Sequence, residues 1–417
     1  MKRVLMVAFH FPPAAGSSGI QRTLRFVQHL PSLGWEPVVV TAHPRAHERT
    51  STDLLRDVPA GVKVVPAFAF DTGRHLSLGG RYPSFLARPD RWQSWRYGGV
   101  AAGLSLMRRH RCDVVWSTYP IATSHVIGAA LHRRTGVPWV ADFRDPMAQD
   151  GYPADPITWR MFKDIEEGAV RDAARSVFTT PGAAQVYRER YPGVPHDRFA
   201  VIENGYDEES FAGTDGAAAA PSHGRLTLVH SGVVYPSERD PTQLMQALAL
   251  LKSEGAIDAG TFSLRFRASE HDTLLDELAR THGVRDMIEL ERAVPYRDAL
   301  AEMMRADGLV VMQASNCNAQ IPAKIYEYLR AGRPMLGLTD PVGDTAQVLR
   351  RAGVSSIAPL DSAAGIAELL RRFLRRDRDD GMTWVAGPDA VRDVSRKARA
   401  AELARLLDEV SAAAPRP

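Results

Sequence analysis

Cysteine is scarce in this sequence: the 417 residues include only Cys112 and Cys317. The two lie far apart, and neither belongs to a CxxC motif or a Cys/His cluster. This usage excludes a disulfide-stapled scaffold and a zinc site of ordinary spacing, and it is typical of a reducing cytoplasm, where we expect the protein to act.

Long apolar runs and a large charge excess are also missing. No uninterrupted apolar stretch reaches the roughly 18 residues of a membrane-spanning helix. The start, MKRVLMVAFHFPP, is too short in its apolar part for a signal peptide, and prolines break it, so a first strand is expected. The formal net charge of +3 gives no general case for nucleic-acid binding, and 45% apolar with 24% charged residues is typical of a globular protein.

Apolar strand patterns alternate with amphipathic helix patterns along the whole chain. In the first half the expected strands cover residues 3–9, 36–42, 62–68, 112–119, 138–143, 176–180 and 199–205. In the second half they cover residues 225–232, 262–269, 287–294, 308–315, 334–339 and 355–360. Such a series predicts an α/β fold with two Rossmann-like domains, each built on a parallel, doubly wound sheet.

Composition sets the expected domain limits. Residues 209–224 are rich in small residues and lack periodicity, so they are expected to link an N-terminal domain (1–208) to a C-terminal domain (225–390). Residues 391–417 are expected to be a helical region.

Ligands of such sheets bind beyond the carboxyl ends of the strands, so the loop at residues 9–23 is the first candidate. Gly16 and Gly19 would let the backbone approach an anion at the following helix. The spacing is neither a GxGxxG fingerprint nor a Walker loop, and the alternative is an ordinary flexible loop.

The stretch ADFRDPM places Asp142, Arg144 and Asp145 directly after an apolar strand. A carboxylate here would serve as a base or orient a hydroxyl. The alternative is a structural ion pair with Arg144.

The third candidate is QIPAKIYEYLRAGRP, residues 320–334, which follows another strand. Pro322 is expected at the first helical position, and free backbone N–H groups near it would hold a phosphate with Lys324. Glu327, a turn later, would accept hydrogen bonds from ribose hydroxyls. The spacing also allows a surface ion pair between Lys324 and Glu327.

A basic and aromatic stretch covers residues 81–99 and is a candidate for the acceptor side or for contact with a membrane surface. Its members are Arg81, Arg88, Arg91, Trp92 and Trp95. For the two tryptophans, packing beneath the loop is the favoured alternative.

Taken together, four motifs resemble the GT-B retaining glycosyltransferases of family GT4. They are KIYEYLRAGRPMLGLT, VIENGYD, the N-terminal strand, loop and helix from RVLMVAF onward, and WVADFRDP. The last resembles a subgroup that often acts in cell-envelope polysaccharide assembly. The resemblance implies two Rossmann-like domains with parallel sheets facing across a cleft, and a C-terminal helix that packs back on the N-terminal domain.

The resemblance also implies site residues. Glu327 matches the residue that binds the nucleotide ribose, and the backbone of Gln320, Ile321 and Pro322 matches the segment that approaches the diphosphate. The loop of Gly16 and Gly19 matches the glycine loop that faces the same phosphates, with Arg22 adding charge. Asp142 and Asp145 match catalytic or acceptor-side positions, and Arg144, Trp92 and Trp95 are assigned to the acceptor side.

Two departures from the family pattern stand out. Ala319 replaces a Glu that reads the donor sugar, and Val233 replaces a basic residue, which leaves Arg239 and Lys324 to neutralise the phosphates. No metal site or cofactor is expected, because basic residues and helix dipoles stabilise the leaving diphosphate in this fold. The acidic triplets near residues 377–380 are interpreted as solvated surface.

The expected function is metal-independent transfer of a sugar from a nucleotide-diphosphate donor to a hydroxyl acceptor, with retention. The acceptor would be a lipid-linked intermediate or a small natural product, and the protein would act in the cytoplasm, at the inner membrane face if its acceptor is lipid-linked. The departures keep two alternatives open: a degenerate GT-B protein that only binds a nucleotide sugar, and a nucleotide-sugar epimerase. The sugar, the base and the oligomeric state do not follow from the sequence.

Overall fold

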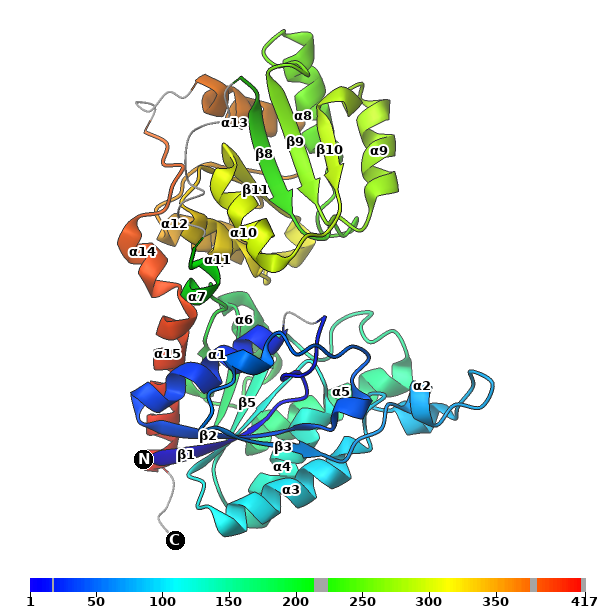
Figure 1. Cartoon of the computed structure of the whole chain (residues 1–417), viewed down its shortest axis with the longest axis vertical. Helices are drawn as coiled ribbons and strands as arrows, with labels where there is room; N and C mark the ends of the chain where they lie inside the picture. Colours follow the sequence, from blue (N-terminus) through cyan, green and yellow to red (C-terminus); the bar gives the residue numbers. More distant parts are fainter. Residues whose placement is uncertain (17–18, 214–223, 376–380, 414–417) are drawn as a thin grey trace. The chain divides into compact units, whose positions relative to one another are not determined.

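The computed structural model describes the chain except for residues 17–18, 214–223, 376–380 and 414–417 (Figure 1). It divides into two compact units. Unit 1 comprises Met1–Asn204 and Arg396–Pro417, and unit 2 comprises Gly205–Ser395. Each unit is built on one parallel sheet, as the alternating pattern predicts.

Unit 1 has a seven-stranded sheet in the order β3-β2-β1-β4-β5-β6-β7. Its strands are β1 (Lys2–Val7), β2 (Trp35–Ala42), β3 (Lys63–Ala67), β4 (Val114–Thr118), β5 (Trp139–Arg144), β6 (Arg175–Phe178) and β7 (Phe199–Val201). Its helices are α1 (Gly19–His29), α2 (Thr72–His75), α3 (Trp95–Arg109), α4 (Thr123–Thr135), α5 (Pro156–Asp172), α6 (Pro181–Arg190) and α15 (Arg396–Ala413). The strand order reverses between β1 and β4, which is the doubly wound arrangement.

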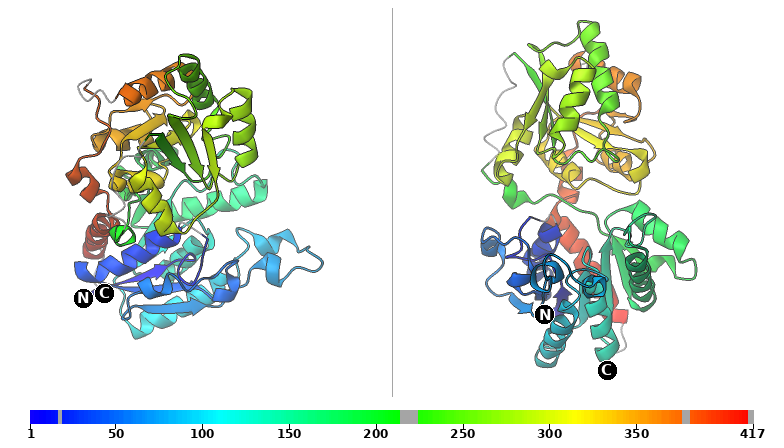
Figure 2. Two further views of the ribbon diagram at one scale, coloured as in Figure 1. Left: turned by 45° about the horizontal axis from the view of Figure 1, so that its top comes forward. Right: turned by 90° about the vertical axis from the view of Figure 1, so that its right-hand side faces the viewer.

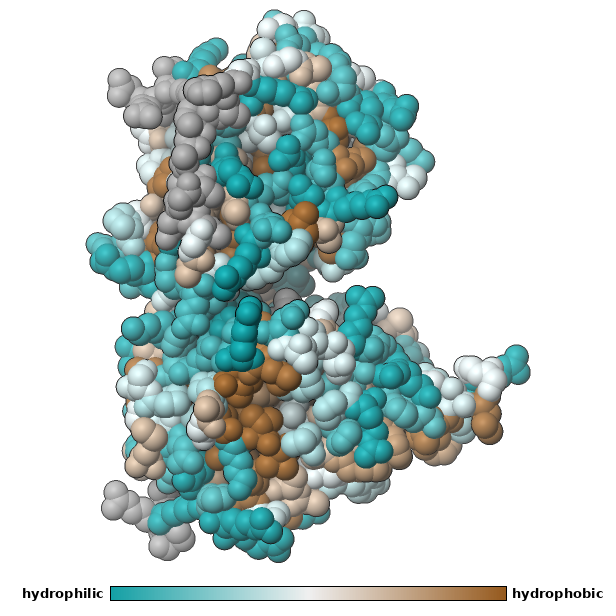
Figure 3. Space-filling model, in the orientation of Figure 1, coloured by the Kyte–Doolittle hydropathy of each residue, from teal (hydrophilic) through white to brown (hydrophobic). Residues whose placement is uncertain are grey.

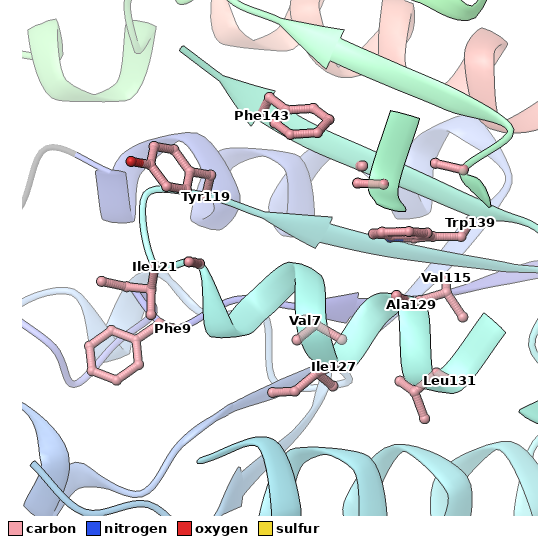
Figure 4. Close-up of a cluster of buried hydrophobic side chains, with 14 of the residues drawn as sticks. Val7, Phe9, Val115, Tyr119, Ile121, Ile127, Ala129, Leu131, Trp139 and Phe143 are labelled. Atoms are coloured by element: carbon pink, nitrogen blue, oxygen red, sulfur yellow. The ribbon is translucent and has the colours of Figure 1, made fainter. Parts of the chain in front are cut away.

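The central strands of the sheet of unit 1 are buried on both faces, which explains why they are mostly apolar. Leu5 and Val7 of β1 face a cluster supplied by α3, α4, α5 and α6, part of which is drawn in Figure 4. Val4 and Met6 face the opposite cluster, which α1 and α15 complete. These two helices lie side by side in Figures 1 and 2, although they come from opposite ends of the chain.

Unit 2 repeats the architecture with a six-stranded sheet in the order β10-β9-β8-β11-β12-β13. Its strands are β8 (Leu226–Ser231), β9 (Phe262–Arg267), β10 (Ile288–Glu291), β11 (Gly308–Gln313), β12 (Met335–Thr339) and β13 (Ile357–Ala358). Its helices are α7 (Glu208–Phe211), α8 (Thr242–Ser253), α9 (Asp272–Thr281), α10 (Tyr296–Arg305), α11 (Lys324–Ala331), α12 (Asp344–Arg351), α13 (Ala363–Arg375) and α14 (Pro388–Asp393). Here the order reverses between β8 and β11.

Two local expectations are corrected. The final helical region is two helices, α14 and α15. The helix is interrupted at Ser395, which pairs with Tyr206 as an isolated bridge. The expected linker begins with α7, whose Phe211 is fully buried in the core of unit 2, so residues 209–211 are not linker. The rest of that linker, residues 214–223, and the acidic triplets near 377–380 lie outside the described residues.

None of the helices in the described part of the chain combines the length and apolar character needed to cross a membrane.

Candidate functional site

Two loops meet where the strand order of unit 2 reverses, which is where α/β sheets bind ligands. One follows β8 and the other, residues 314–323, follows β11. The N–H of Ala314 donates to the carbonyl of Glu238 (2.7 Å), and the side-chain amide of Asn316 donates to the carbonyl of Ser237 (2.8 Å). The carbonyl of Asn318 accepts from the first residue of α12 (2.9 Å). The loop before α11 is therefore held on both sides.

The start of α11 presents backbone donors. The helix begins at Lys324 with Ala323 as its N-cap, so Pro322 precedes the cap instead of taking the first helical position. The difference arises because the Pro322 carbonyl already accepts from the N–H of Ile325 (3.0 Å) as a turn leading into the helix. Among the described residues, none accepts a hydrogen bond from the N–H of Ile321, Ala323 or Lys324. Such N–H groups at a helix start favour an anion.

Lys324 brings its ammonium group to the end of β8. A Cβ added at Gly232, whose φ is +120°, would lie 1.7 Å from Lys324 Nζ, so only glycine leaves room for this side chain. Burial, together with the nearby Arg239 cation, lowers the pKa of Lys324 to about 8, while Glu327 opposes the shift. In the described part of the chain no acceptor bonds Lys324 Nζ, so Lys324 and Glu327 do not form the surface ion pair that their spacing allowed.

Arg239 lies near the ammonium group of Lys324. Its guanidinium donates to the carbonyl of Val233 (2.7 Å) and lies over the ring of Tyr235. Its Nε is buried with no hydrogen-bond partner among the described residues, and no described carboxylate forms an ion pair with it. Two cations without a carboxylate partner thus flank the free N–H groups of α11, which makes this region attractive to a polyanion.

Glu327 lies on α11, one turn after the free donors. Its carboxylate accepts a hydrogen bond from the hydroxyl of Tyr296 (2.6 Å), the first residue of α10. Glu327 is half-buried, so Tyr296 orients the carboxylate without covering it.

Three buried polar atoms lie at this edge, and none belongs to a residue that the sequence interpretation assigned to the site. They are His230 Nε2, Gln313 Oε1 and Thr339 Oγ1, and none has a hydrogen-bond partner among the described residues. Each belongs to the last or next-to-last residue of β8, β11 or β12, in an otherwise apolar strand. A polar residue that ends an apolar strand was the available signal.

In unit 1, Arg22 and Asp142 form a buried ion pair. Arg22 donates to both carboxylate oxygens of Asp142 (2.8 and 3.1 Å) and to the carbonyl of Glu203, while Thr118 donates to Asp142 (2.7 Å). The side chains are only 3% and 0% exposed. Their hydrogen-bonding groups are committed to each other, which favours a structural role for the pair. The donor-binding role of Arg22 and the catalytic role of Asp142 stay predictions.

Arg144 and Asp145 follow a register shift at the end of β5. Arg144 has φ of +65°, a left-handed conformation that is uncommon outside glycine and clusters at functional sites. Thr179 holds this turn: its N–H donates to the Arg144 carbonyl (2.8 Å) and its hydroxyl donates to Asp145 (3.3 Å). Asp145 itself is exposed, so its carboxylate is accessible to a ligand at this turn.

A pocket of about 350 Å³ opens beside the loop that follows β1. It is lined by Phe9, His10, Ala14, Ala15, Gly16, His47, Glu48, Arg49 and Trp92. Burial, reinforced by Arg144, lowers the pKa of His10 to about 4, and burial also lowers that of His47 to about 4, so both rings are neutral at pH 7. His10 Nδ1 and His47 Nε2 are buried and have no hydrogen-bond partner in the described residues.

The remaining predicted residues are placed as follows. Trp92 lines the pocket, packs on Phe9 and donates to the carbonyl of Ala46 (2.9 Å). Trp95 is fully buried and packs in the core, as the alternative interpretation predicts, so its side chain cannot contact an acceptor. Gly16 has φ of +81° and lines the pocket, whereas Gly19 opens α1. Between them, residues 17–18 lie outside the described chain.

Comparison with known proteins agrees with this architecture. Residues 18–205 match the family described as glycosyl transferase 4-like domain. No curated protein sequence matches significantly. Among solved structures, sucrose-phosphate synthase from Thermosynechococcus elongatus is similar with a TM-score of 0.66 and 14% identity, covering 99% of this chain and 100% of that one.

Two further structures show the same likeness. A UDP-forming trehalose-phosphate synthase from Burkholderia xenovorans, in complex with glucose-6-phosphate, has a TM-score of 0.62 and 14% identity over 97% of this chain and 100% of that one. The lipopolysaccharide outer core galactosyltransferase WaaB, in its apo form, has a TM-score of 0.62 and 10% identity over 97% of this chain and 99% of that one. The chain therefore has the GT-B fold and carries a GT4-like glycosyltransferase domain at residues 18–205.

Proposed function

We propose that this protein transfers a sugar from a nucleotide-diphosphate donor to a hydroxyl acceptor, with retention at the anomeric carbon. The observation that carries the proposal is the anion site of unit 2. It combines the free N–H groups of Ile321, Ala323 and Lys324 with two cations, Lys324 and Arg239, that have no carboxylate partner among the described residues.

Different residues of this site bind different chemical groups of the donor. The diphosphate binds the N–H groups and the two cations, and the Glu327 carboxylate accepts hydrogen bonds from the ribose hydroxyls. The orphaned polar atoms of His230, Gln313 and Thr339 form the floor of the donor site. We propose no specific donor sugar, since Ala319 replaces the residue by which this family reads it.

The acceptor binds in the pocket of unit 1. Neutral His10 and His47 each offer one N–H donor and one lone pair, which suits the hydroxyls of a sugar or a polyol. Trp92 and Phe9 supply the apolar wall against which a sugar ring packs. Arg144 adds a positive charge near His10, so a phosphorylated acceptor is favoured, as in the synthase that contains glucose-6-phosphate.

In the reaction, the acceptor oxygen forms a bond to the anomeric carbon while the bond from that carbon to the phosphate oxygen breaks. The bonding electron pair goes to the diphosphate, whose new charge the cations and N–H groups stabilise. The acceptor proton passes to the leaving phosphate on the same face, which retains the configuration. Asp145 orients the acceptor hydroxyl. No divalent metal is needed, so turnover is expected to survive treatment with EDTA.

The wider role follows from the motif WVADFRDP. We propose that the protein acts in the cytoplasm, in the assembly of a polysaccharide, a glycoconjugate or a natural product.

The test starts with the donor. Thermal stabilisation by a panel of UDP-, GDP- and dTDP-sugars identifies the base, and calorimetry then measures the affinity. We expect Glu327→Ala to weaken donor binding roughly 10- to 100-fold, because hydrogen bonds to a charged group are lost. Glu277→Ala, an exposed glutamate on α9, is the matched control and should bind as wild type. Unchanged affinity in Glu327→Ala would remove the ribose role.

Adding acceptor separates the proposal from its alternatives. Release of nucleoside diphosphate only when an acceptor is present supports transfer. Donor binding without release identifies a nucleotide-sugar binding protein, and conversion of the donor without acceptor identifies an epimerase. Either of these two results overturns the proposed transfer.

A further inference from the structure

An arm of unit 1 exposes large apolar side chains. We define the arm as residues 74–85, which begin with the last two residues of α2 and protrude from the rest of unit 1 in Figure 1. Leu78 is 87% exposed and Phe85 65% exposed, and Leu76 and Tyr82 are also exposed. Apolar atoms are visible toward the end of the arm in Figure 3. Clusters of this kind on a protein surface mark an interaction site.

The arm is cationic as well as apolar. No aspartate or glutamate occurs between Asp71 and Asp90, whereas Arg74 and Arg81 lie on the arm. Arg88, just beyond it, is paired with Asp155 (3.0 Å) and adds no free charge. Asp71 is buried and its carboxylate is bound by Arg91 (2.6 and 2.8 Å), so it adds no exposed negative charge at the base of the arm.

Beside the arm, two further exposed aromatic rings are each covered by an arginine side chain. Arg45 lies over the ring of Phe68, and Arg96 lies over the ring of Tyr97. The exposed surface thus mixes leucine, aromatic and arginine side chains, the composition that proteins use where they meet a lipid–water interface.

The end of the arm is held in shape. Leu78 and Arg81 exchange both backbone hydrogen bonds (2.8 and 3.1 Å) across a turn in which Gly79 and Gly80 have φ of +57° and +77°. The Thr72 hydroxyl ties the base of the arm by donating to the carbonyl of Leu86 (2.6 Å). Leu78 is therefore presented to the outside by a hydrogen-bonded hairpin.

We infer that this arm docks unit 1 on the surface of an anionic lipid bilayer. Leu78 and Phe85 enter the interfacial layer, and the arginines pair with lipid headgroups. A bilayer fits better than a protein partner, because the apolar side chains lie on a narrow projection together with Arg74 and Arg81, neither of which forms an ion pair with a described carboxylate. This surface differs from the one expected from the sequence: Arg91, Trp92 and Trp95 are tied inward, while Leu76, Leu78 and Phe85 were not singled out.

The experiment measures co-sedimentation of the full chain with phosphatidylglycerol and phosphatidylcholine vesicles, without nucleotide sugar. The wild type should bind phosphatidylglycerol vesicles, bind phosphatidylcholine vesicles more weakly, and lose binding as salt rises. The double variant Leu78→Glu with Phe85→Glu should lower the partition coefficient by about tenfold or more. Arg81→Glu should weaken binding and flatten its salt dependence.

Val342→Glu is the matched control, because Val342 is 74% exposed in unit 2 and should not affect binding. All these positions are exposed, so melting temperatures should stay within a few degrees of wild type. Equal binding by wild type and the double variant overturns the proposal. So does a wild type that ignores vesicles but self-associates through the arm, detected as a sedimentation change abolished by the double variant. Because no donor is present, failure here leaves the proposed transfer untouched.

Discussion

At the scale of single residues, the main feature of unit 2 is a lysine held against a glycine. Gly232 gives Lys324 a place that any other residue would fill, and the same burial lowers the pKa of Lys324 to about 8. The ammonium group of Lys324 is therefore charged at neutral pH, but it loses its proton within about one pH unit above neutrality. A diphosphate bound here, as proposed, would raise this pKa, since it would add a negative charge beside the ammonium group.

This feature predicts a pH dependence of donor binding. Below pH 8 Lys324 is charged and contributes to affinity; as the pH rises through 8 to 9 the charge is lost, so affinity should fall by up to about tenfold per pH unit. Calorimetric titration of donor from pH 6.5 to 9.5 checks this. Lys324→Met should bind about 10- to 100-fold more weakly at pH 7 and show no such fall. A wild-type affinity that stays flat to pH 9.5 contradicts the assignment.

Residue partners were harder to predict than residue types. Asp142, Arg22, Lys324 and Glu327 were all singled out from the sequence, but the pairing of Arg22 with Asp142 joins α1 to β5 and depends on the assembled sheet. The same holds for Tyr296, which reaches Glu327 from α10. Local spacing shows which charged and polar side chains could bind a ligand, whereas tertiary structure decides which of them are already paired with other residues.

At the scale of elements, a buried hydrogen bond joins β8 to α11. The Tyr328 hydroxyl accepts from the N–H of Ser231 (2.7 Å), the last residue of β8. Tyr328 is buried, and this bond fixes the strand end that leads into Gly232, against which Lys324 lies.

Tyr328→Phe should therefore destabilise unit 2 by about 1 to 3 kcal/mol, since it leaves the buried N–H of Ser231 without a partner. Hydrogen exchange measures this directly: amides in β8 and α11 should exchange faster, and amides in β1 should not change. Tyr296→Phe, which removes an exposed hydroxyl, is the control and should shift the free energy of unfolding by less than about 0.5 kcal/mol. Unchanged exchange in β8 of Tyr328→Phe would contradict the role given to this bond.

The regular elements were the most predictable part of the fold. Each of the thirteen strands in the described residues overlaps a segment predicted from an apolar run and extends at most one residue beyond it, because a sheet covered on both faces needs such runs. The start of α11 was placed two residues early, and the last helical region was predicted as one helix although the Tyr206–Ser395 pairing divides it. Helix ends depend on caps and long-range pairs, which hydrophobic periodicity does not record.

At the scale of the whole molecule, the last helix completes the first unit. Leu403 and Leu407 of α15 are buried against residues of α1 and the sheet of unit 1, and Arg399 bonds the carboxylate of Glu203 (3.1 Å). The stability of unit 1 therefore depends on the far end of the chain.

Leu407→Ala should lower the free energy of unfolding of unit 1 by about 2 to 5 kcal/mol, through lost burial and the cavity that remains. Tryptophan fluorescence during urea denaturation reports this, because six of the seven tryptophans lie in unit 1. Donor binding by unit 2 should persist at low urea.

The matched control is Leu248→Ala, fully buried in the core of unit 2, which should disturb donor binding and leave most of the fluorescence transition in place. If Leu407→Ala instead left that transition unchanged, the proposed dependence on α15 would be wrong.

The path of the chain also sets an order for synthesis. Residues 205–395 leave the ribosome before α15, so unit 2 is complete in the nascent chain while one apolar face of unit 1 still lacks its cover. At ordinary rates of translation the synthesis of residues 205–395 takes roughly 10 to 40 s, and α15 follows only then. During this time the earlier-made unit is the one that needs protection by chaperones, and it reaches its final form last.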